Sequence, residues 1–218
     1  MPGLRATASP AGEEYLEAIH KFGRTPDGVS TTRLAEHLQV TPASVTGMLR
    51  RLAKAGLISY RRYGEIALSE EGERRAHVLI KRHRLAERLL TDVLKMPLEA
   101  AHEEACRLEH ALSPEVEAHL ETALGSPSSC PHGYPMDADA EDHTFALAEA
   151  PAGPALTIAR LDEERPEVVR YLSERRLLPG AQVKIRKREA LGGVLIVEVE
   201  GKRHHLSAEL AGAIRVAR

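Results

Sequence analysis

Six side chains that can bind a metal fall on two short stretches in the middle of the chain. In the first stretch, His83 and Glu87 are four residues apart, so they share one face of a helix. In the second stretch, helical spacing places four more donors on one stripe: His102, Cys106, Glu109 and His110. Imidazole, thiolate and carboxylate groups together bind divalent transition metals. A solvated charged face with a buried histidine explains either row alone, whereas both rows together favour a metal site.

Two further donors lie in a connector rich in proline, glycine and serine that begins at Gly125. Cys130 and His132 are two residues apart in this connector, between proline and glycine. They could form a two-ligand claw, but two ligands do not make a site, and a linker turn explains the same letters. Cys130 and His132 would therefore bind a metal only if other ligands lie close to them.

The donor types narrow the choice of metal and of function. Mixed nitrogen, oxygen and sulfur donors suit Mn(II), Fe(II), Co(II), Ni(II) or Zn(II), and the many carboxylates favour Mn(II) or Fe(II). Residues 102–106 read H-E-E-A-C, with cysteine where a zinc protease has its second histidine. Glu99 and His102 form only one copy of a motif that di-iron proteins use twice. We therefore expect a metal-binding protein and not an enzyme.

The elements before these ligands have the pattern of a winged helix-turn-helix. A short helix from Thr31, a turn at Gln39–Val40 and a helix over residues 42–55 form the helix-turn-helix. Two strands around Tyr63–Gly64 follow as the wing, which an ordinary helical hairpin would lack. Small residues that begin the second helix allow close approach to bases, and basic residues suit phosphates. The residues expected at DNA are Thr41, Ser44, Thr46, Arg50, Arg51, Arg61 and Arg62.

The rest of the chain predicts two more domains. Apolar residues at four-residue spacing continue to Leu124, either as the subunit's own core or as a helical dimer interface. Five strand-like runs and one helix after residue 154 predict a small SH3-like β-barrel. The fold class is therefore α+β, mainly α. We expect a winged helix-turn-helix domain at 1–75, a helical metal-binding and dimerisation domain with its linker at 76–150, and the SH3-like domain at 151–218.

Charge is distributed unevenly along the chain. The net charge of −2 conceals balances of +5 over residues 1–84, −11 over residues 85–150 and +4 over residues 151–218. The basic N-terminal segment suits a nucleic-acid partner, and the acidic central segment suits bound cations. The sequence shows no apolar run that could span a bilayer and no signal peptide. We therefore expect a cytoplasmic protein with no membrane partner, in which both cysteines stay reduced.

With these motifs in view, the chain resembles the diphtheria-toxin repressor family of metal-dependent transcriptional regulators, which includes the manganese transport regulators. The resemblance covers essentially the whole length. It is most specific in H-R-L-A-E-R-L-L-T-D, in H-E-E-A-C-R-L-E-H and in C-P-H-G. It implies a homodimer on a palindromic operator of double-stranded DNA, metal-activated repression of metal-uptake genes, and no small-molecule substrate.

The resemblance also implies two metal sites per subunit for Mn(II) or Fe(II). In iron-type members, His83, Glu87 and His102 match one site. The other site matches Cys106, Glu109 and His110, together with a methionine from the first helix. Glu14 stands at that methionine's position, and Glu17 follows one turn later. Carboxylates there resemble the manganese-type members.

The connector gains a role from the same resemblance. In manganese-type members with a third domain, the positions of Cys130 and His132 join Glu87 and an acidic residue of the third domain. By position that residue is Glu163, with Asp162 and Glu164 as close alternatives.

One departure and two rival hypotheses remain. Gly47 stands where iron-type repressors carry a base-reading glutamine, so the operator sequence cannot be transferred. A metal storage or redox protein could use the winged domain as a scaffold, and would then oxidise Fe(II) or turn over a substrate. Alternatively, a DNA-binding protein could hold a purely structural metal, in which case the apoprotein would be unfolded.

Overall fold

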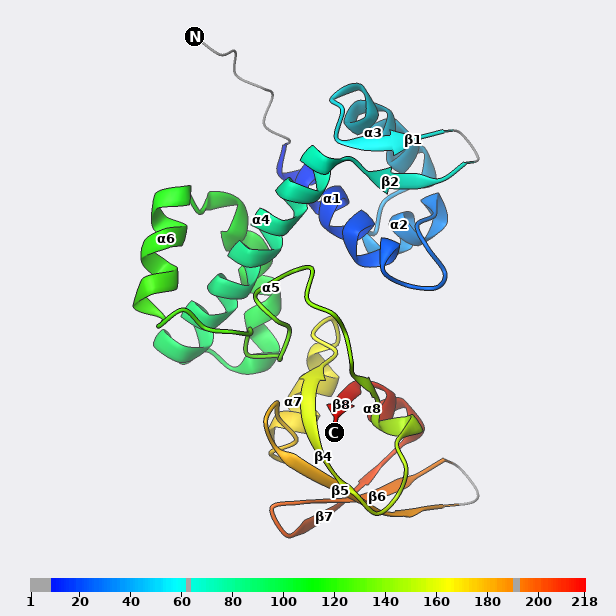
Figure 1. Ribbon diagram of the computed structural model, residues 1–218, viewed down its shortest axis with the longest axis vertical. Helices are drawn as coiled ribbons and strands as arrows, with labels where there is room; N and C mark the ends of the chain where they lie inside the picture. The colour runs from blue at the N-terminus through cyan, green and yellow to red at the C-terminus, as the bar shows by residue number, and fades with distance from the viewer. Residues whose placement is uncertain (1–8, 62–63, 190–192) are drawn as a thin grey trace. The chain divides into compact units, whose positions relative to one another are not determined.

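The computed structural model describes residues 9–61, 64–189 and 193–218 (Figure 1). The chain forms two compact units, Met1–Lys81 and Arg82–Arg218. The division falls inside helix α4 (Glu70–Arg88), which therefore contributes to both units. Among the described residues, no helix has the length and apolarity needed to cross a membrane.

The first unit contains the helix-turn-helix and its wing. Helix α1 (Pro10–Gly23) is followed by α2 (Thr31–His37) and α3 (Pro42–Lys54). Strands β1 (Ile58–Tyr60) and β2 (Ile66–Leu68) pair antiparallel, as the wing requires (Figure 1).

Local chemistry explains where these helices begin and which face they bury. Each N-cap is a hydroxyl side chain, and the one before α3, Thr41, accepts a hydrogen bond from the Ser44 amide. The apolar positions of α3 are buried in a core shared with α1 and the wing. At the start of α4, a Cβ on Gly72 would lie 2.0 Å from the Leu57 carbonyl oxygen, so only glycine lets the wing meet this helix.

The helices of the second unit differ from the prediction in one turn. Helix α4 continues into a π-helical turn, η1 (Leu89–Val93), and α5 (Leu98–Leu108) follows. The next three residues form the 3-10 turn η2 (Glu109–Ala111), and α6 is Pro114–Ala123. Because a 3-10 turn winds more tightly than an α-helix, Glu109 and His110 leave the single α-helical stripe predicted for them with His102 and Cys106.

The second unit also contains a six-stranded antiparallel sheet. Its strands are β3 (Phe145–Ala146), β4 (Ala155–Leu161), β5 (Gln182–Arg188), β6 (Leu195–Val199), β7 (Lys202–Leu206) and β8 (Ile214–Ala217). Three short helices accompany them: η3 (Leu147–Glu149), α7 (Pro166–Ser173) and α8 (Ala208–Gly212). The order β3-β8-β4-β5-β6-β7 leaves the sheet open in the described part of the chain, rather than closed as a barrel. Closure would need β3 to pair with β7, and β3 has only two residues.

Alternation of burial along the strands builds the core of this sheet. In β6 every second residue is buried, as expected for a strand with one face on a core. The buried positions of β4, β5 and β8 join the same core with apolar residues of α7. One end of β4 lies close to the connector, and this end contributes to the site described next.

Candidate metal centre

Seven of the donors predicted for the second unit form two groups. We call His83, His102 and Cys106 the helical group, because all three lie on α4 and α5. We call Glu87, Cys130, His132 and Glu163 the connector group, because two of its members lie in the segment between α6 and β3. In each group the ligand atoms lie within 4.8 Å of one another.

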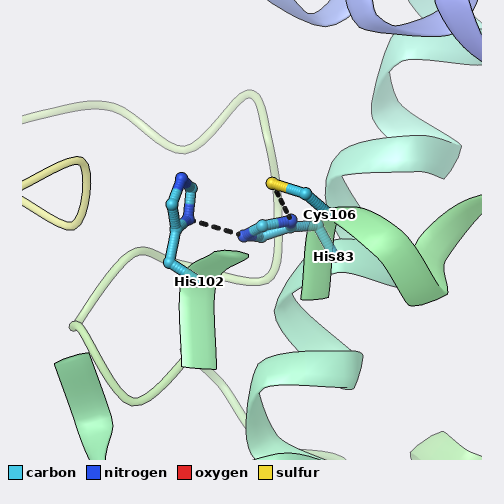
Figure 2. A group of neighbouring side chains, drawn as sticks. All are labelled: His83, His102 and Cys106. Atoms are coloured by element: carbon cyan, nitrogen blue, oxygen red, sulfur yellow. Dashed lines mark hydrogen bonds between the residues drawn. The ribbon is translucent and has the colours of Figure 1, made fainter. Parts of the chain in front are cut away.

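The helical group is centred on the imidazole of His83 (Figure 2). Its Nε2 atom lies 3.1 Å from Nδ1 of His102, and its Nδ1 atom lies 3.9 Å from Sγ of Cys106. Nδ1 also lies 2.6 Å from Oε2 of Glu109, which is fully buried. An ionised carboxylate only accepts hydrogen bonds, so Nδ1 donates its proton there and Nε2 is available to a metal.

The connector group is centred on the carboxylate of Glu87. Nδ1 of His132 lies 2.9 Å from Oε1 of Glu87 and 3.9 Å from Oε2 of Glu163. The other ring nitrogen, Nε2, is 3.2 Å from the Leu98 carbonyl oxygen, to which it must donate its proton. The neutral ring of His132 therefore directs a lone pair at a carboxylate oxygen. This arrangement is repulsive unless a proton or a cation lies between the two atoms.

The burial of the connector group also indicates that a cation binds there. Glu87 and His132 are completely buried, and Cys130 is 1% exposed. Among the described residues, neither carboxylate oxygen of Glu87 nor Nδ1 of His132 has a hydrogen bond. Buried polar atoms without such partners are costly and commonly mark an ion site. The donor set of one imidazole, one thiol and two carboxylates fits a divalent transition metal.

The same contacts shift the pKa values of Glu87, His83 and His132. Burial alone would raise the pKa of Glu87, but the imidazoles of His102, His132 and His83 outweigh it and hold this pKa well below its usual value. Burial alone would lower the pKa of His83, but Cys106, Glu109 and Glu87 raise it well above the usual value. The pKa of His132 is raised in the same way, mainly by Glu87. Protons are held where a cation would bind.

Two other members of the connector group favour their neutral forms. Burial, followed by the negative charge of Glu87, raises the pKa of the Cys130 thiol well above its usual value. Burial and the same charge raise the pKa of Glu163. A bound cation would reverse both effects, because it stabilises the thiolate and the carboxylate that ligate it.

Two arginines of α4 hold the connector against the helix. Nε of Arg88 donates to the Ser129 carbonyl oxygen at 2.8 Å, and its Nη2 lies 3.3 Å from the Cys130 carbonyl oxygen. The guanidinium of Arg84 donates to the Pro135 carbonyl oxygen. These residues directly follow Glu87 and His83, so each predicted ligand of α4 has a neighbouring arginine that fixes the connector.

A glycine brings the same segment onto the sheet. Gly133 has φ +96°, and a Cβ there would lie 2.0 Å from the Ala159 carbonyl oxygen. The Leu161 amide donates to the His132 carbonyl oxygen at 2.9 Å. Only glycine permits this approach, which carries His132 to the end of β4 beside Glu163.

The structure thus brings eight predicted ligands together in one unit. They are His83, Glu87, His102, Cys106, Glu109, Cys130, His132 and Glu163. His110 lies beside Glu109, with Nε2 3.6 Å from Oε1, and the two belong to one group of neighbouring donors. Of the three acidic residues after β4, Glu163 joins the connector group, whereas Asp162 accepts a local bond from the Glu164 amide at 3.3 Å. Glu14 and Glu17 lie on α1 of the first unit, and their role as ligands stays a prediction.

The division of ligands agrees only in part with the one implied by the resemblance to iron-type members, in which Cys106 and Glu109 share a site with His110. Glu109 and His110 do lie in one group of neighbouring donors, whereas Cys106 lies in the helical group, and Glu109 also contacts His83. Sequence analysis also missed Arg84, Arg88 and the Leu98 carbonyl oxygen. The repeated pairing of a ligand with an arginine at 83–84 and 87–88 was the available signal for the first two.

The residues expected at DNA lie on α3 and the wing. Thr41 and Ser44 share a hydroxyl contact of 2.9 Å at the start of α3, and Thr46 donates to the Pro42 carbonyl oxygen at 3.0 Å. Their hydroxyls therefore stabilise the helix end. Arg50, Arg51 and Arg61 are exposed, and Arg62 lies outside the described residues. Gly47 is exposed with open space where a Cβ would stand, so the backbone of α3 is accessible there.

Comparison with known families accounts for nearly the whole chain. Residues 8–66 match "Iron dependent repressor, N-terminal DNA binding domain", and residues 69–138 match "Iron dependent repressor, metal binding and dimerisation domain". Residues 145–218 match "FeoA domain". The chain is 31% identical to the iron-dependent repressor IdeR of Mycobacterium bovis, over 94% of this chain and 95% of that protein. It is 29% identical to the diphtheria toxin repressor of Corynebacterium efficiens, over 94% of each.

Solved structures give the same picture. A structure described as a manganese-dependent transcriptional repressor in complex with manganese has a TM-score of 0.86 and 30% identity, and the match covers 94% of this chain and 98% of that one. The structure of ScaR with bound Cd²⁺ has a TM-score of 0.79 and 26% identity, covering 95% and 99%. The similarity therefore extends over the DNA-binding, metal-binding and sheet regions together.

Proposed function

This chain belongs to the iron-dependent repressor family of metal-dependent, DNA-binding transcriptional regulators, and from that premise we propose that it represses metal-uptake genes when Mn(II) or Fe(II) fills the two ligand groups. The family consists of regulators and not of enzymes, and the relatives are iron- or manganese-dependent repressors. The observation that carries the proposal is the buried carboxylate of Glu87, which has imidazoles and a thiol around it but no hydrogen bond among the described residues.

The positions of the ligands explain how metal binding would affect DNA binding. A bound metal ion would supply the positive charge that neutralises Glu87 and the thiolate of Cys130. His132 would bind this ion through Nδ1, because Nε2 donates its proton to the Leu98 carbonyl oxygen. Helix α4 carries His83 and Glu87, and its N-terminal part belongs to the unit that contains the wing. Metal binding favours one conformation of this shared helix, and its effect on DNA binding cannot exceed its difference in affinity for the two conformations.

The second partner we propose is another copy of this chain. Large apolar side chains are exposed in the helical region of the second unit, with exposed fractions of 56% for Val93, 61% for Leu94 and 49% for Val116. Large apolar side chains left exposed in this way support a helical homodimer interface. A two-fold dimer presents two α3 helices about 34 Å apart, one turn of duplex, and therefore reads a palindromic operator.

We also propose that the chain works as three domains, as the matched segments suggest. The winged domain is taken as 1–75, the metal-binding and dimerisation domain as 76–150, and the SH3-like domain as 151–218. The proposed contacts to DNA are made by Thr41, Ser44, Thr46, Arg50, Arg51, Arg61 and Arg62. The proposed ligands include Glu14 and Glu17 beside those of the second unit.

Selection of DNA from a random library tests the proposed dimer on a palindrome. Protein saturated with Mn(II) should select a two-fold-symmetric sequence, and sedimentation should give the mass of two chains on each duplex. The affinity for that duplex should fall steeply with salt, because lysine and arginine displace counterions. Selection of an asymmetric sequence by a single chain would contradict the proposed dimer.

A metal series on one substitution tests the choice of metal. Glu14 offers a hard oxygen donor where the iron-type members carry methionine, so Glu14→Met should shift preference from Mn(II) toward Fe(II) and later metals. DNA affinity measured across Mn(II), Fe(II), Co(II) and Zn(II) gives the preference of each protein. Equal preference for iron in both proteins would contradict a manganese role for Glu14.

A further inference from the structure

A further donor cluster lies within the first unit and consists of residues that belong to neither of the two groups described above. It consists of His20 on α1 together with Glu73 and His77 in the first turns of α4. We propose that these three side chains form a separate site for a divalent metal ion, with Zn(II) as the best-suited metal. This proposal does not depend on the function proposed above, because none of the three residues belongs to the helical or the connector group.

The imidazoles of His20 and His77 approach the same carboxylate oxygen of Glu73. Oε2 of Glu73 lies 2.9 Å from Nδ1 of His20 and 3.5 Å from Nε2 of His77. One ring nitrogen of His20 and one of His77 lie within 4.8 Å of each other. The rings meet edge to face, with centroids 4.9 Å apart. Residues from two different helices therefore each place an imidazole nitrogen near the same carboxylate oxygen.

These separations are close to those of a tetrahedral metal site. Zinc binds nitrogen and oxygen ligands at about 2.0–2.2 Å, so two ligands of one tetrahedral ion are about 3.4 Å apart. The two separations from Glu73, 2.9 and 3.5 Å, bracket that value. Small rotations of the side chains would place both nitrogens and the oxygen on one ion. Two histidines and a glutamate form a known zinc ligand set that leaves a fourth position for water.

The pattern of exposure also suits an ion that exchanges with solvent. The side chain of His20 is 7% exposed, whereas those of Glu73 and His77 are 44% and 30% exposed. The imidazole of His20 is thus buried, and the other two donors are accessible to solvent. The fourth ligand, a water molecule, can reach the ion from that side.

An ion pair alone explains less of this arrangement. An ion pair between His20 and Glu73 accounts for the contact of 2.9 Å, but not for the approach of a second imidazole, that of His77, to 3.5 Å from the same oxygen. A single metal ion satisfies both rings and the carboxylate at once. Bound there, it would link α1 to the start of α4, and α1 also carries Glu14 and Glu17.

Zinc stoichiometry of the full chain tests the proposal. Equilibrium dialysis at controlled free Zn(II), with metal counted by mass spectrometry, should give one equivalent fewer per chain for His77→Gln than for the parent. Glu73→Gln should lose the same equivalent or bind it at least about tenfold more weakly. Both substituted side chains are partly exposed, so the variants should fold. His119→Gln is the matched control, because His119 is an exposed helical histidine outside all three clusters.

Cobalt separates this site from the ligands of the second unit. The proposed site contains no thiol, so Co(II) bound there gives no thiolate charge-transfer band, whereas Cys106 and Cys130 in the second unit can give one. His77→Gln should therefore lower the number of bound metal ions and leave that band unchanged. Zinc binding equal to that of the parent and the His119→Gln control would overturn the proposal. A loss of zinc that weakens the thiolate band in proportion would also overturn it.

Discussion

The helical and connector groups collect their donors from different ranges of the sequence. The helical group uses three residues of two helices that follow one another, between 83 and 106. The connector group draws on α4, on the loop before the sheet and on the turn after β4, so its members are up to 76 residues apart, from Glu87 to Glu163. One group can form from a helical hairpin, whereas the other exists only when the sheet and the connector are docked.

Burial follows the same division. Glu87 and His132 are completely buried, whereas the side chain of His102 is 25% exposed. The connector group thus lies deeper and depends on more of the fold. Binding energy released there acts on helix, connector and sheet together, so this group is the better placed to change conformation. The helical group can bind metal without moving the sheet.

Substitution of Glu87 should have the largest effect, because its carboxylate contacts members of both groups. Oε1 lies 2.9 Å from His132, 3.4 Å from His83 and 3.6 Å from His102. Removing a residue that only supports a ligand costs about 10–100-fold in metal affinity, so Glu87→Gln should cost more than about 100-fold at the connector group. Isothermal titration with Mn(II) measures the loss. Glu103→Gln on the exposed face of α5 is the control, and equal affinities in the two variants would refute the central place of Glu87.

The docking of the connector can be broken without touching a donor. Gly133→Ala places a Cβ against the Ala159 carbonyl oxygen, at a φ of +96° that strains any other residue. The expected loss is about 3 kcal/mol or more of unfolding free energy, measured by denaturant titration. Gly180→Ala is the matched control: its φ is +88°, but nothing lies within 4 Å of the added Cβ, so about 1 kcal/mol is expected. Similar losses would show that strain, and not the close approach, decides the effect.

Acidity should act in opposite directions on metal affinity and on metal-free stability. The pKa values of His83 and His132 are raised above the ordinary value of 6.5, so both rings hold protons that a metal must displace. Mn(II) affinity should therefore rise by about tenfold per pH unit for each proton displaced, from pH 6.5 upward through the raised values.

The sign for stability is opposite for the same histidines. A raised pKa in the folded state stabilises the metal-free protein below pH 6.5, and this contribution is lost as pH rises through the folded pKa. Metal-free protein should thus lose stability over the range in which Mn(II) binding gains strength. Calorimetry with and without chelator follows both, and parallel trends would contradict the proton-for-metal exchange.

The smallest expected effect separates the two groups most cleanly. Arg88→Ala removes hydrogen bonds to the Ser129 and Cys130 carbonyl oxygens but leaves every donor in place. Metal affinity at the connector group should fall by about tenfold, and the helical group should keep its affinity. Arg107→Ala is the control, because Arg107 is an exposed arginine of α5 that pairs with Glu103 and Glu104 of the same helix. A loss of affinity confined to the helical group would contradict the role given to Arg88.

The helical group was within reach of sequence analysis because helical periodicity is local. Spacings of four residues place His83 with Glu87 and His102 with Cys106, and proline at 97 separates the two helices. The same periodicity failed for Glu109 and His110, which lie on a 3-10 turn after α5. The strands were also predictable from alternation, although the open edge of the sheet was not, because closure depends on pairing between distant strands.

The connector group could not be predicted from local sequence patterns. Nothing in the letters around Cys130 and His132 states which residues they meet, and a linker turn explained them equally well. Their position follows from two arginines of α4 and from a glycine that fits against β4. Family resemblance supplied Glu163 as the partner, with two neighbouring acids as alternatives, and the structure places Glu163 with this group.

The central claim is that metal held around Glu87 controls binding to DNA. Fluorescence anisotropy of a duplex selected by the Mn(II)-loaded protein tests it directly, with the parent and Glu87→Gln titrated with Mn(II) and then with a chelator. The affinity of the parent for DNA should rise by about tenfold or more with Mn(II) and fall back after chelation, whereas Glu87→Gln should stay near the metal-free value. Equally tight binding by the chelated parent and the Mn(II)-loaded parent would contradict the account.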